Sequence, residues 1–200
     1  MTGRKKVLFI SVLAVLLASV VFIVLTTNKE SRRLATIDPS EAKIEQGEQT
    51  LLKPGEIPVT STRYKSQYIQ VKGRTIHYAN AGVKNAQKTI NKKPNTEAAT
   101  WSGVRVNSVT DKKHTHFIAH NPGAFSALLK VKKGDKITVV DNKKRKKTYK
   151  VTLVTKCDDY AYEIKTKRDL WNTIVSTGGG ERITLQTCLS KTVNLLIEAK

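Results

Sequence analysis

The stretch "ITLQTCLSKTVNLLIEAK", residues 183–200, contains two strand-like runs separated by a short polar loop. The runs, 183–187 and 193–199, are rich in the β-branched and aliphatic residues typical of strands. Cys188 lies directly after the first run. A cysteine there is compatible with a buried inert thiol, with a disulfide to Cys157, or with a nucleophile at the tip of a strand. The sequence leaves these three interpretations open.

Short runs of the same kind recur upstream and are punctuated by Gly, Asn and Asp. They are "QYIQVKGRTIHYA" (67–79), "HTHFIAH" (114–120), "DKITVVD" (135–141) and "KTYKVTLVTK" (147–156). The first divides around Lys72-Gly73, which predicts a hairpin. One or two helical turns are expected within 121–135, before Gly134. Six or more short strands with few helices predict an all-β sandwich or barrel.

The N-terminus predicts a membrane anchor. Residues 7–25 are uncharged and apolar, and Arg4, Lys5 and Lys6 precede them. This run is about long enough to cross a hydrocarbon core of roughly 30 Å. We expect residues 1–6 in the cytoplasm, a transmembrane signal anchor at 7–27, an extracellular stalk at 28–62 and a folded extracellular domain at 63–200. A cleaved signal peptide is the alternative, but the run is long for one.

The net charge of +20 is extreme for 200 residues. It predicts attraction to polyanions such as nucleic acid, lipid headgroups or cell-wall polymers, or else a solvated basic surface with no single partner. The basic runs at 91–94 and 141–150 are typical of hairpin loops and lack the interleaved aromatic residues that base stacking requires. We therefore expect no nucleic-acid partner.

Three of the four histidines, His114, His116 and His120, fall in one strand-like run. A strand rises about 3.3 Å per residue, so the first and last of these lie roughly 20 Å apart and cannot bind one zinc ion together. His114 and His116 remain candidates for a partial metal site, although partly exposed strand positions are the simpler interpretation. His120 closes an apolar run before the turn "NPG" and is suited to meet Cys188 at a neighbouring strand tip.

Two segments resemble those of the sortases, the cysteine transpeptidases of Gram-positive cell envelopes. "ITLQTC" resembles their Thr-Leu-x-Thr-Cys signature, and "HFIAHNPGAFSALLKVKKGDKITV" resembles their histidine segment. The chain order also matches, with His120 well before Cys188. The resemblance covers residues 63–200 and implies a closed β-barrel with short helices behind a single transmembrane helix. It implies Cys188 as the nucleophile and His120 as the acid/base partner.

The chain departs from this pattern at two positions. Ala119 precedes the histidine where the family usually has glycine. No arginine follows Cys188, and aligning the last strand places Asn194 where the family has its catalytic arginine. Arg182 belongs to the far end of the cysteine strand, roughly 20 Å away. Lys191 lies in the intervening loop, and Arg105 and Arg168 are the other possible substitutes.

The resemblance implies an extracellular, membrane-anchored transpeptidase without a cofactor. It would cleave a Leu-Pro-x-Thr-Gly-like sorting signal through a Cys188 thioacyl intermediate. It would then transfer the acyl group to an amine of a peptidoglycan precursor or a pilin lysine. Asn194 would serve as a neutral hydrogen-bond donor. Two alternatives are a degenerate module that binds sorting signals or wall polymers without turnover, and a metal-binding domain using His114 and His116.

Overall fold

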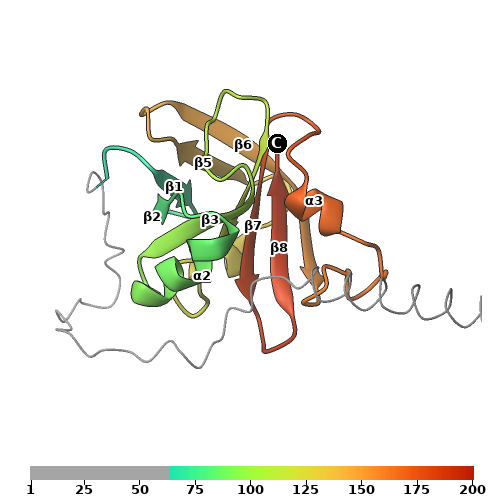
Figure 1. Ribbon diagram of the computed structural model, residues 1–200. Coiled ribbons are helices and arrows are strands. Elements are labelled where there is room, and N and C mark those ends of the chain that lie inside the picture. The colour runs from blue at the N-terminus through green and yellow to red at the C-terminus, as the bar shows by residue number, and fades with distance from the viewer. Residues whose placement is uncertain (1–63) are drawn as a thin grey trace, which may run out of the picture. The chain divides into compact units, whose positions relative to one another are not determined.

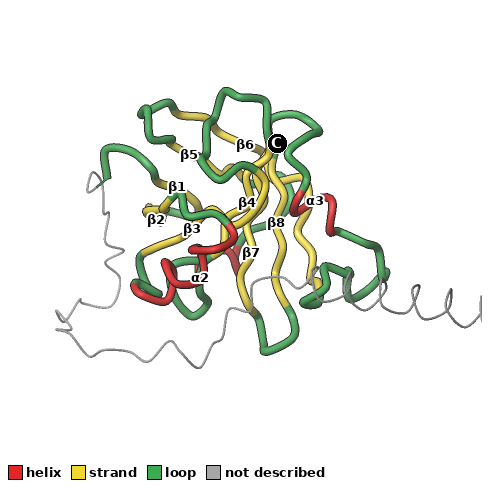
Figure 2. Tube along the Cα trace, in the orientation of Figure 1, coloured by secondary structure: helices red, strands yellow, loops and turns green. Residues whose placement is uncertain are grey.

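A computed structural model describes residues 64–200, which form a closed eight-stranded barrel in the order β1-β2-β3-β4-β7-β8-β6-β5 (Figure 1). Short helices interrupt the strands, as the colouring of Figure 2 shows. The expected all-β barrel is confirmed. The strands are β1 (Tyr68–Val71), β2 (Arg74–Ala79), β3 (Glu97–Gly103), β4 (His114–Ile118), β5 (Lys136–Val140), β6 (Lys146–Cys157), β7 (Arg182–Cys188) and β8 (Asn194–Ala199). The helices are α2 (Val83–Lys92), the 3-10 helix η2 (Ser126–Lys130) and α3 (Trp171–Val175).

The tight turns form where the sequence predicts them. Lys72 and Gly73 join β1 to β2 with φ angles of 47° and 75°, the left-handed pair that a two-residue hairpin turn requires. The basic run after β5 closes a second hairpin, in which the Asp141 carboxylate accepts hydrogen bonds from the backbone N–H groups of Lys143 and Arg145. The hairpin loop expected at 91–94 is wrong, because these residues end α2 and lead into β3.

Two parallel pairings bring distant segments together. β2 pairs with β3, and β4 pairs with β7 from His114↔Arg182 to Ile118↔Gln186. Because parallel strands run in the same direction, β4 and β7 end at the same rim of the barrel. β8 starts at this rim and returns antiparallel beside β7. The fold therefore gathers the C-terminal ends of two strands and the N-terminal end of a third.

The barrel interior is apolar, and its wall carries polar groups on the outer face of β4, β7 and β8. Alternate residues point inward and build the core together with η2, among them Tyr78, Phe117, Phe125, Ile137, Tyr149, Leu185 and Ile197. The intervening residues of β4 and β7 are buried as well. The helix α3 and the residues that follow it cover part of this outer face. The Ser176 carbonyl, directly after α3, contacts the ring of His114. A buried polar layer therefore lies outside the core and leads to the rim.

Three elements were not predicted from the sequence: α2, β3 and α3. The transmembrane anchor at 7–27 and the stalk at 28–62 lie outside the described residues and stay predictions. Within residues 64–200, no helix has both the length and the apolar character needed to cross a membrane.

Candidate active site

Cys188 and His120 lie at the shared rim of β7 and β4. Cys188 is the last residue of β7, and His120 follows β4 by two residues. Continuing the Ile118↔Gln186 register by two positions places His120 beside Cys188 on the neighbouring strand, about 4.8 Å away in backbone spacing. Both residues are buried.

Hydrogen bonds between the two strand ends hold this juxtaposition in place. The Thr187 hydroxyl donates to the Ala119 carbonyl at 2.8 Å. The Asn121 amide donates to the Cys188 carbonyl at 3.0 Å. These bonds bracket the two candidate residues from either side and tie the ends of β4 and β7 together.

An asparagine that sequence reasoning missed also contacts the candidate histidine. Asn91, in the last turn of α2, lies with its Oδ1 2.9 Å from Nε2 of His120. The same oxygen accepts a hydrogen bond from Gln87 at 2.8 Å, so it is an acceptor. An acceptor at Nε2 is compatible with the imidazolium form, in which both ring nitrogens carry hydrogen. No local pattern in the sequence pointed to Asn91, because its segment resembled a loop.

Asn194 lies directly opposite the candidate nucleophile. β8 begins at Asn194, which pairs with Cys188 on one side and with Cys157 of β6 on the other. Residues paired across an antiparallel ladder project from the same face. The Cys188 thiol donates to Asn194 Oδ1 at 3.8 Å, while Asn194 Nδ2 donates to Asp159 Oδ1 at 3.1 Å. The side chain points toward the thiol as expected, but with its oxygen rather than with the expected N–H donor.

The ladder register keeps the two cysteines apart. They flank Asn194 on opposite sides, so their backbones lie two strand spacings apart, about 9.6 Å. A disulfide needs Cα atoms within about 4.4–6.8 Å. Neither Cys157 nor Cys188 forms a disulfide. Burial, together with the charges of Asp158 and Asp159, raises the pKa of Cys157 to about 12, so this thiol stays protonated and inert at neutral pH.

The arginines considered as substitutes make contacts of their own. Arg182 is ion-paired with Glu198 at 3.5 Å and also donates to the Gly178 carbonyl, at the opposite end of β7. Arg168 is ion-paired with Glu163 at 3.5 Å, in the loop after β6. The side chain of Arg105 lies against Gly82. Lys191 is exposed in the β7–β8 loop.

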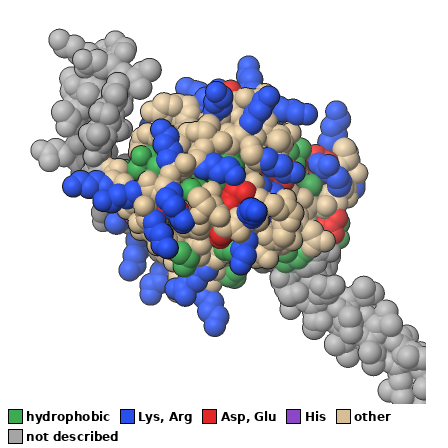
Figure 3. Space-filling model, turned by 90° about the horizontal axis from the view of Figure 1, so that it is seen from above, with side chains coloured by type: hydrophobic (Ala, Val, Ile, Leu, Met, Phe, Trp, Pro, Cys, Tyr) green, Lys and Arg blue, Asp and Glu red, His purple; other side chains and the backbone are tan. Residues whose placement is uncertain are grey.

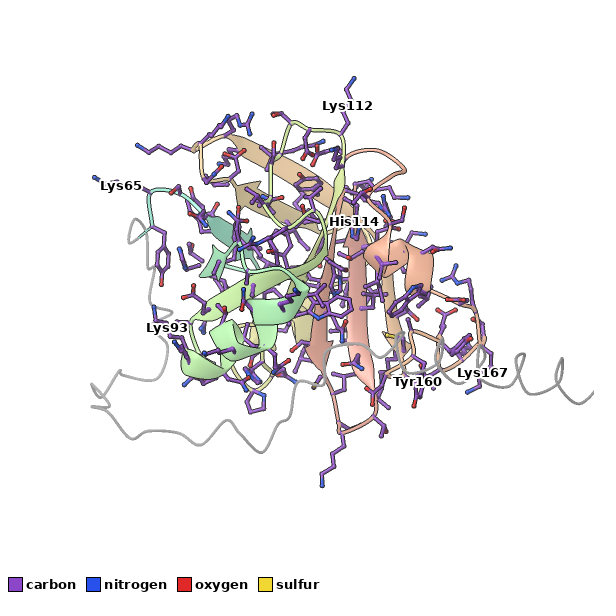
Figure 4. All side chains as sticks on the ribbon, viewed as in Figure 1. Lys65, Lys93, Lys112, His114, Tyr160 and Lys167 are labelled. Carbon is purple, nitrogen blue, oxygen red and sulfur yellow. The ribbon has the colours of Figure 1, made fainter. Side chains whose placement is uncertain are left out.

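His114 and His116 are fully buried, so their expected partial exposure is wrong. Both rings contact the Thr184 hydroxyl at 2.7 Å. Burial lowers the pKa of His114 to about 4 and that of His116 to about 3. Within residues 64–200, no group of three or more His, Cys, Asp or Glu side chains could hold a metal ion. Figure 4 labels His114 near the middle of the domain and Tyr160 toward the lower right, in the loop after β6.

The family model of the Sortase domain matches residues 61–200. Among solved structures, sortase A of Listeria monocytogenes is 20% identical, with a TM-score of 0.48 over 68% of this chain and 87% of the other. A pilus-related sortase C of Group B Streptococcus is 21% identical, with a TM-score of 0.44 over 87% and 83%. A Clostridium perfringens sortase D5 transpeptidase is 11% identical, with a TM-score of 0.46 over 66% and 76%. No curated protein matches the chain.

Proposed function

We propose that this chain, which belongs to the sortase family of cysteine transpeptidases, cleaves a Leu-Pro-x-Thr-Gly-like sorting signal and transfers its acyl part to an amine. One observation carries the assignment. Cys188 ends β7, His120 follows the parallel strand β4 by two residues, and the Thr187–Ala119 and Asn121–Cys188 hydrogen bonds bracket them. A thiol and an imidazole on neighbouring strand ends are the minimum that thioacyl chemistry needs.

The first step forms a thioester. The Cys188 sulfur, as thiolate, attacks the carbonyl carbon of the scissile Thr–Gly bond, and a C–S bond forms. The C–N bond breaks as the His120 imidazolium gives its proton to the leaving amine. The enzyme then holds an acyl group on Cys188 and a neutral imidazole on His120.

The second step reverses the proton transfer. The amine of a peptidoglycan precursor or a pilin lysine attacks the thioester, a new amide forms and the C–S bond breaks. His120 takes the proton of the attacking amine, so the thiolate–imidazolium pair is restored. No cofactor enters either step.

Oxyanion stabilisation is the part of the mechanism that this chain must perform differently. In the family an arginine donates charged hydrogen bonds, which are about twice as strong as neutral ones. Asn194 stands at the equivalent strand start and is neutral. It can donate to a developing oxyanion only when its N–H, rather than its oxygen, faces Cys188.

The location we propose is the cell membrane, with residues 7–27 as a single-pass anchor and the catalytic domain outside. The surface of the domain is suited to an anionic envelope, because Lys and Arg side chains are spread over the face seen in Figure 3. The net charge of +20 has the same sign.

Mass spectrometry of the protein after incubation with a sorting-signal peptide library tests the function. We expect an acyl adduct on Cys188 in the parent and in the matched control Cys157→Ala, and none in Cys188→Ala. Peptide binding without an adduct would instead support the non-catalytic module. One observation favours that alternative. The Asn194 N–H donates to Asp159 and therefore does not face Cys188.

A further inference from the structure

A continuous row of buried polar side chains leads to Asn194 along the outer face of β4 and β7. We call it the histidine–amide row; its members are His114, Thr184, His116, Gln186 and Asn194. Each of the five is at most 2% exposed. From the Ser176 carbonyl, successive contacts measure 2.9 Å to His114, 2.7 Å to Thr184, 2.7 Å to His116, 3.2 Å to Gln186 and 3.1 Å to Asn194.

The first four contacts of the row need four hydrogens. A carbonyl oxygen supplies none, a neutral imidazole supplies one, and a hydroxyl supplies one. His114, Thr184 and His116 therefore supply three in their neutral forms. The fourth must come either from a second proton on one of the rings or from the side-chain amide of Gln186.

Burial disfavours a second ring proton. It lowers the pKa of His114 to about 4 and that of His116 to about 3, with a contribution from the Arg182 charge near the first ring. Both rings are then neutral at pH 7. In the structure the Gln186 oxygen faces His116, and the Gln186 nitrogen donates to Asn194 Oδ1. To supply the missing hydrogen, the Gln186 amide must turn so that its nitrogen faces His116 and its oxygen faces Asn194.

When the Gln186 amide turns over, the Asn194 amide must turn over as well. Two amide oxygens cannot face each other at 3.1 Å without losing a hydrogen bond, so Asn194 must present its nitrogen to Gln186. The atom of Asn194 that contacts Gln186 is the same atom that contacts the Cys188 sulfur. Turning the amide therefore places an N–H donor at the thiol.

Asp159 opposes this turn. Its carboxylate accepts from the Asn194 nitrogen at 3.1 Å and so favours the orientation in which the oxygen faces Cys188. That oxygen can accept from a thiol but repels a thiolate. Asp159 is only half-buried in the loop after β6, so water can solvate it when Asn194 turns away.

We propose that His116 and Gln186 are positioning residues that turn the Asn194 amide toward Cys188, so that its N–H stabilises the thiolate and then the oxyanion. The inference rests on the proposed function of Asn194. It assigns the work of the family's arginine to a neutral amide whose direction is set by buried groups one and two contacts away.

The rate of Cys188 alkylation by iodoacetamide as a function of pH tests the proposal. The midpoint of this profile reports the thiolate, which displaces iodide, and it needs no peptide substrate. The titratable groups on the surrounding elements include His120, Cys157, Asp158, Asp159 and Lys191. Site-resolved peptide mass spectrometry separates Cys188 from Cys157.

Gln186→Met keeps the side-chain volume but removes the oxygen that would accept from Asn194. Asp159 alone then sets the direction of the Asn194 amide. We expect the midpoint to rise by about half to one pH unit, the equivalent of one neutral hydrogen bond. Asp159→Asn offers an N–H to the Asn194 oxygen and should lower the midpoint by a similar amount.

The same changes in an Asn194→Ala background are the control. The Gln186→Met shift should disappear there, and the Asp159→Asn shift should shrink to its charge contribution. An unchanged midpoint in folded Gln186→Met, or equal shifts in both backgrounds, would overturn the proposal. If Gln186→Met does not fold, the Asp159→Asn pair decides by the same criterion. An acyl adduct without these shifts would leave the function standing and remove the positioning role.

Discussion

Acidification from pH 7 to pH 5 is expected to destabilise this domain through His114 and His116. Both rings are fully buried, and burial lowers their pKa values from 6.5 to about 4 and about 3. In the unfolded chain each ring would titrate near its ordinary value. Between about pH 6.5 and pH 4 the unfolded chain therefore binds more protons than the folded one. Stability must fall as the pH falls through this window.

The size of the loss follows from the same values. At pH 5 an unfolded histidine lies about 1.5 pH units below its pKa, which stabilises the unfolded state by about 2 kcal/mol per ring. The two rings together give about 4 kcal/mol, and nearly all of this is absent at pH 7. A domain of ordinary stability, about 5–15 kcal/mol, would lose a large part of its margin.

Urea unfolding at the two pH values measures the effect. Tryptophan fluorescence is a suitable signal because the ring of Trp101 lies 5.7 Å from that of His116. The comparison is between the parent and the double variant His114→Gln/His116→Gln, with His77→Gln as a control at a half-buried histidine outside the row. We expect the parent to lose about 4 kcal/mol more than the double variant between pH 7 and pH 5. Parallel losses would refute the reasoning, because the two neutral buried rings would then not be the source of the pH dependence.

Three further predictions concern the site and its location. Cys188→Ala should abolish the acyl adduct without unfolding, and His120→Ala should do nearly as much damage through loss of the acid/base partner; an adduct on Cys157 in either variant would contradict the assignment. Asn194→Ala should lower the acylation rate by roughly one to three powers of ten, whereas Asn194→Arg should restore or raise it where the longer fork fits; an alanine variant as fast as the parent would make Asn194 structural only. On cells stripped of their wall, the domain should be protease-accessible and remain membrane-bound, and a fragment starting near residue 27 in the medium would show a cleaved signal instead.

Local sequence patterns predicted most of the strands because their residues carry strong local signals. Alternating β-branched residues mark β1, β2, β5 and β6, and Lys72-Gly73 supplies the backbone angles of the first hairpin. β3 was missed because "EAATWSG" has only one β-branched residue, and its burial depends on partners from β2 and β4. α2 has no side-chain cap and buries only Ala86 and Ile90, so its sequence resembled a polar loop.

The candidate site was partly visible for a related reason. The motifs that contain Cys188, His120 and Asn194 have fixed spacing along the chain. Once the strands pair in register, residues at these positions lie close together. The roles of Asn91, Asp159 and Gln186 depend on contacts between segments far apart in the chain or on the direction of an amide. Similarly, the burial of His114 arises from the segment after α3, whose Ser176 carbonyl contacts the ring 62 positions away. No local pattern contains that information.

An asparagine at the position predicted for the family's arginine would have to stabilise charge in a different way. A guanidinium is cationic in every orientation, so it stabilises a thiolate wherever its fork can reach. A neutral amide stabilises an anion with one end and repels it with the other, so its direction decides its effect. The first strand position of β8 is buried between Cys188 and Cys157, so the direction of the amide there must be set by the side chains it contacts. The histidine–amide row on one side and Asp159 on the other set the direction in which this amide meets the Cys188 sulfur, and the balance between them determines whether Asn194 can act in place of the arginine.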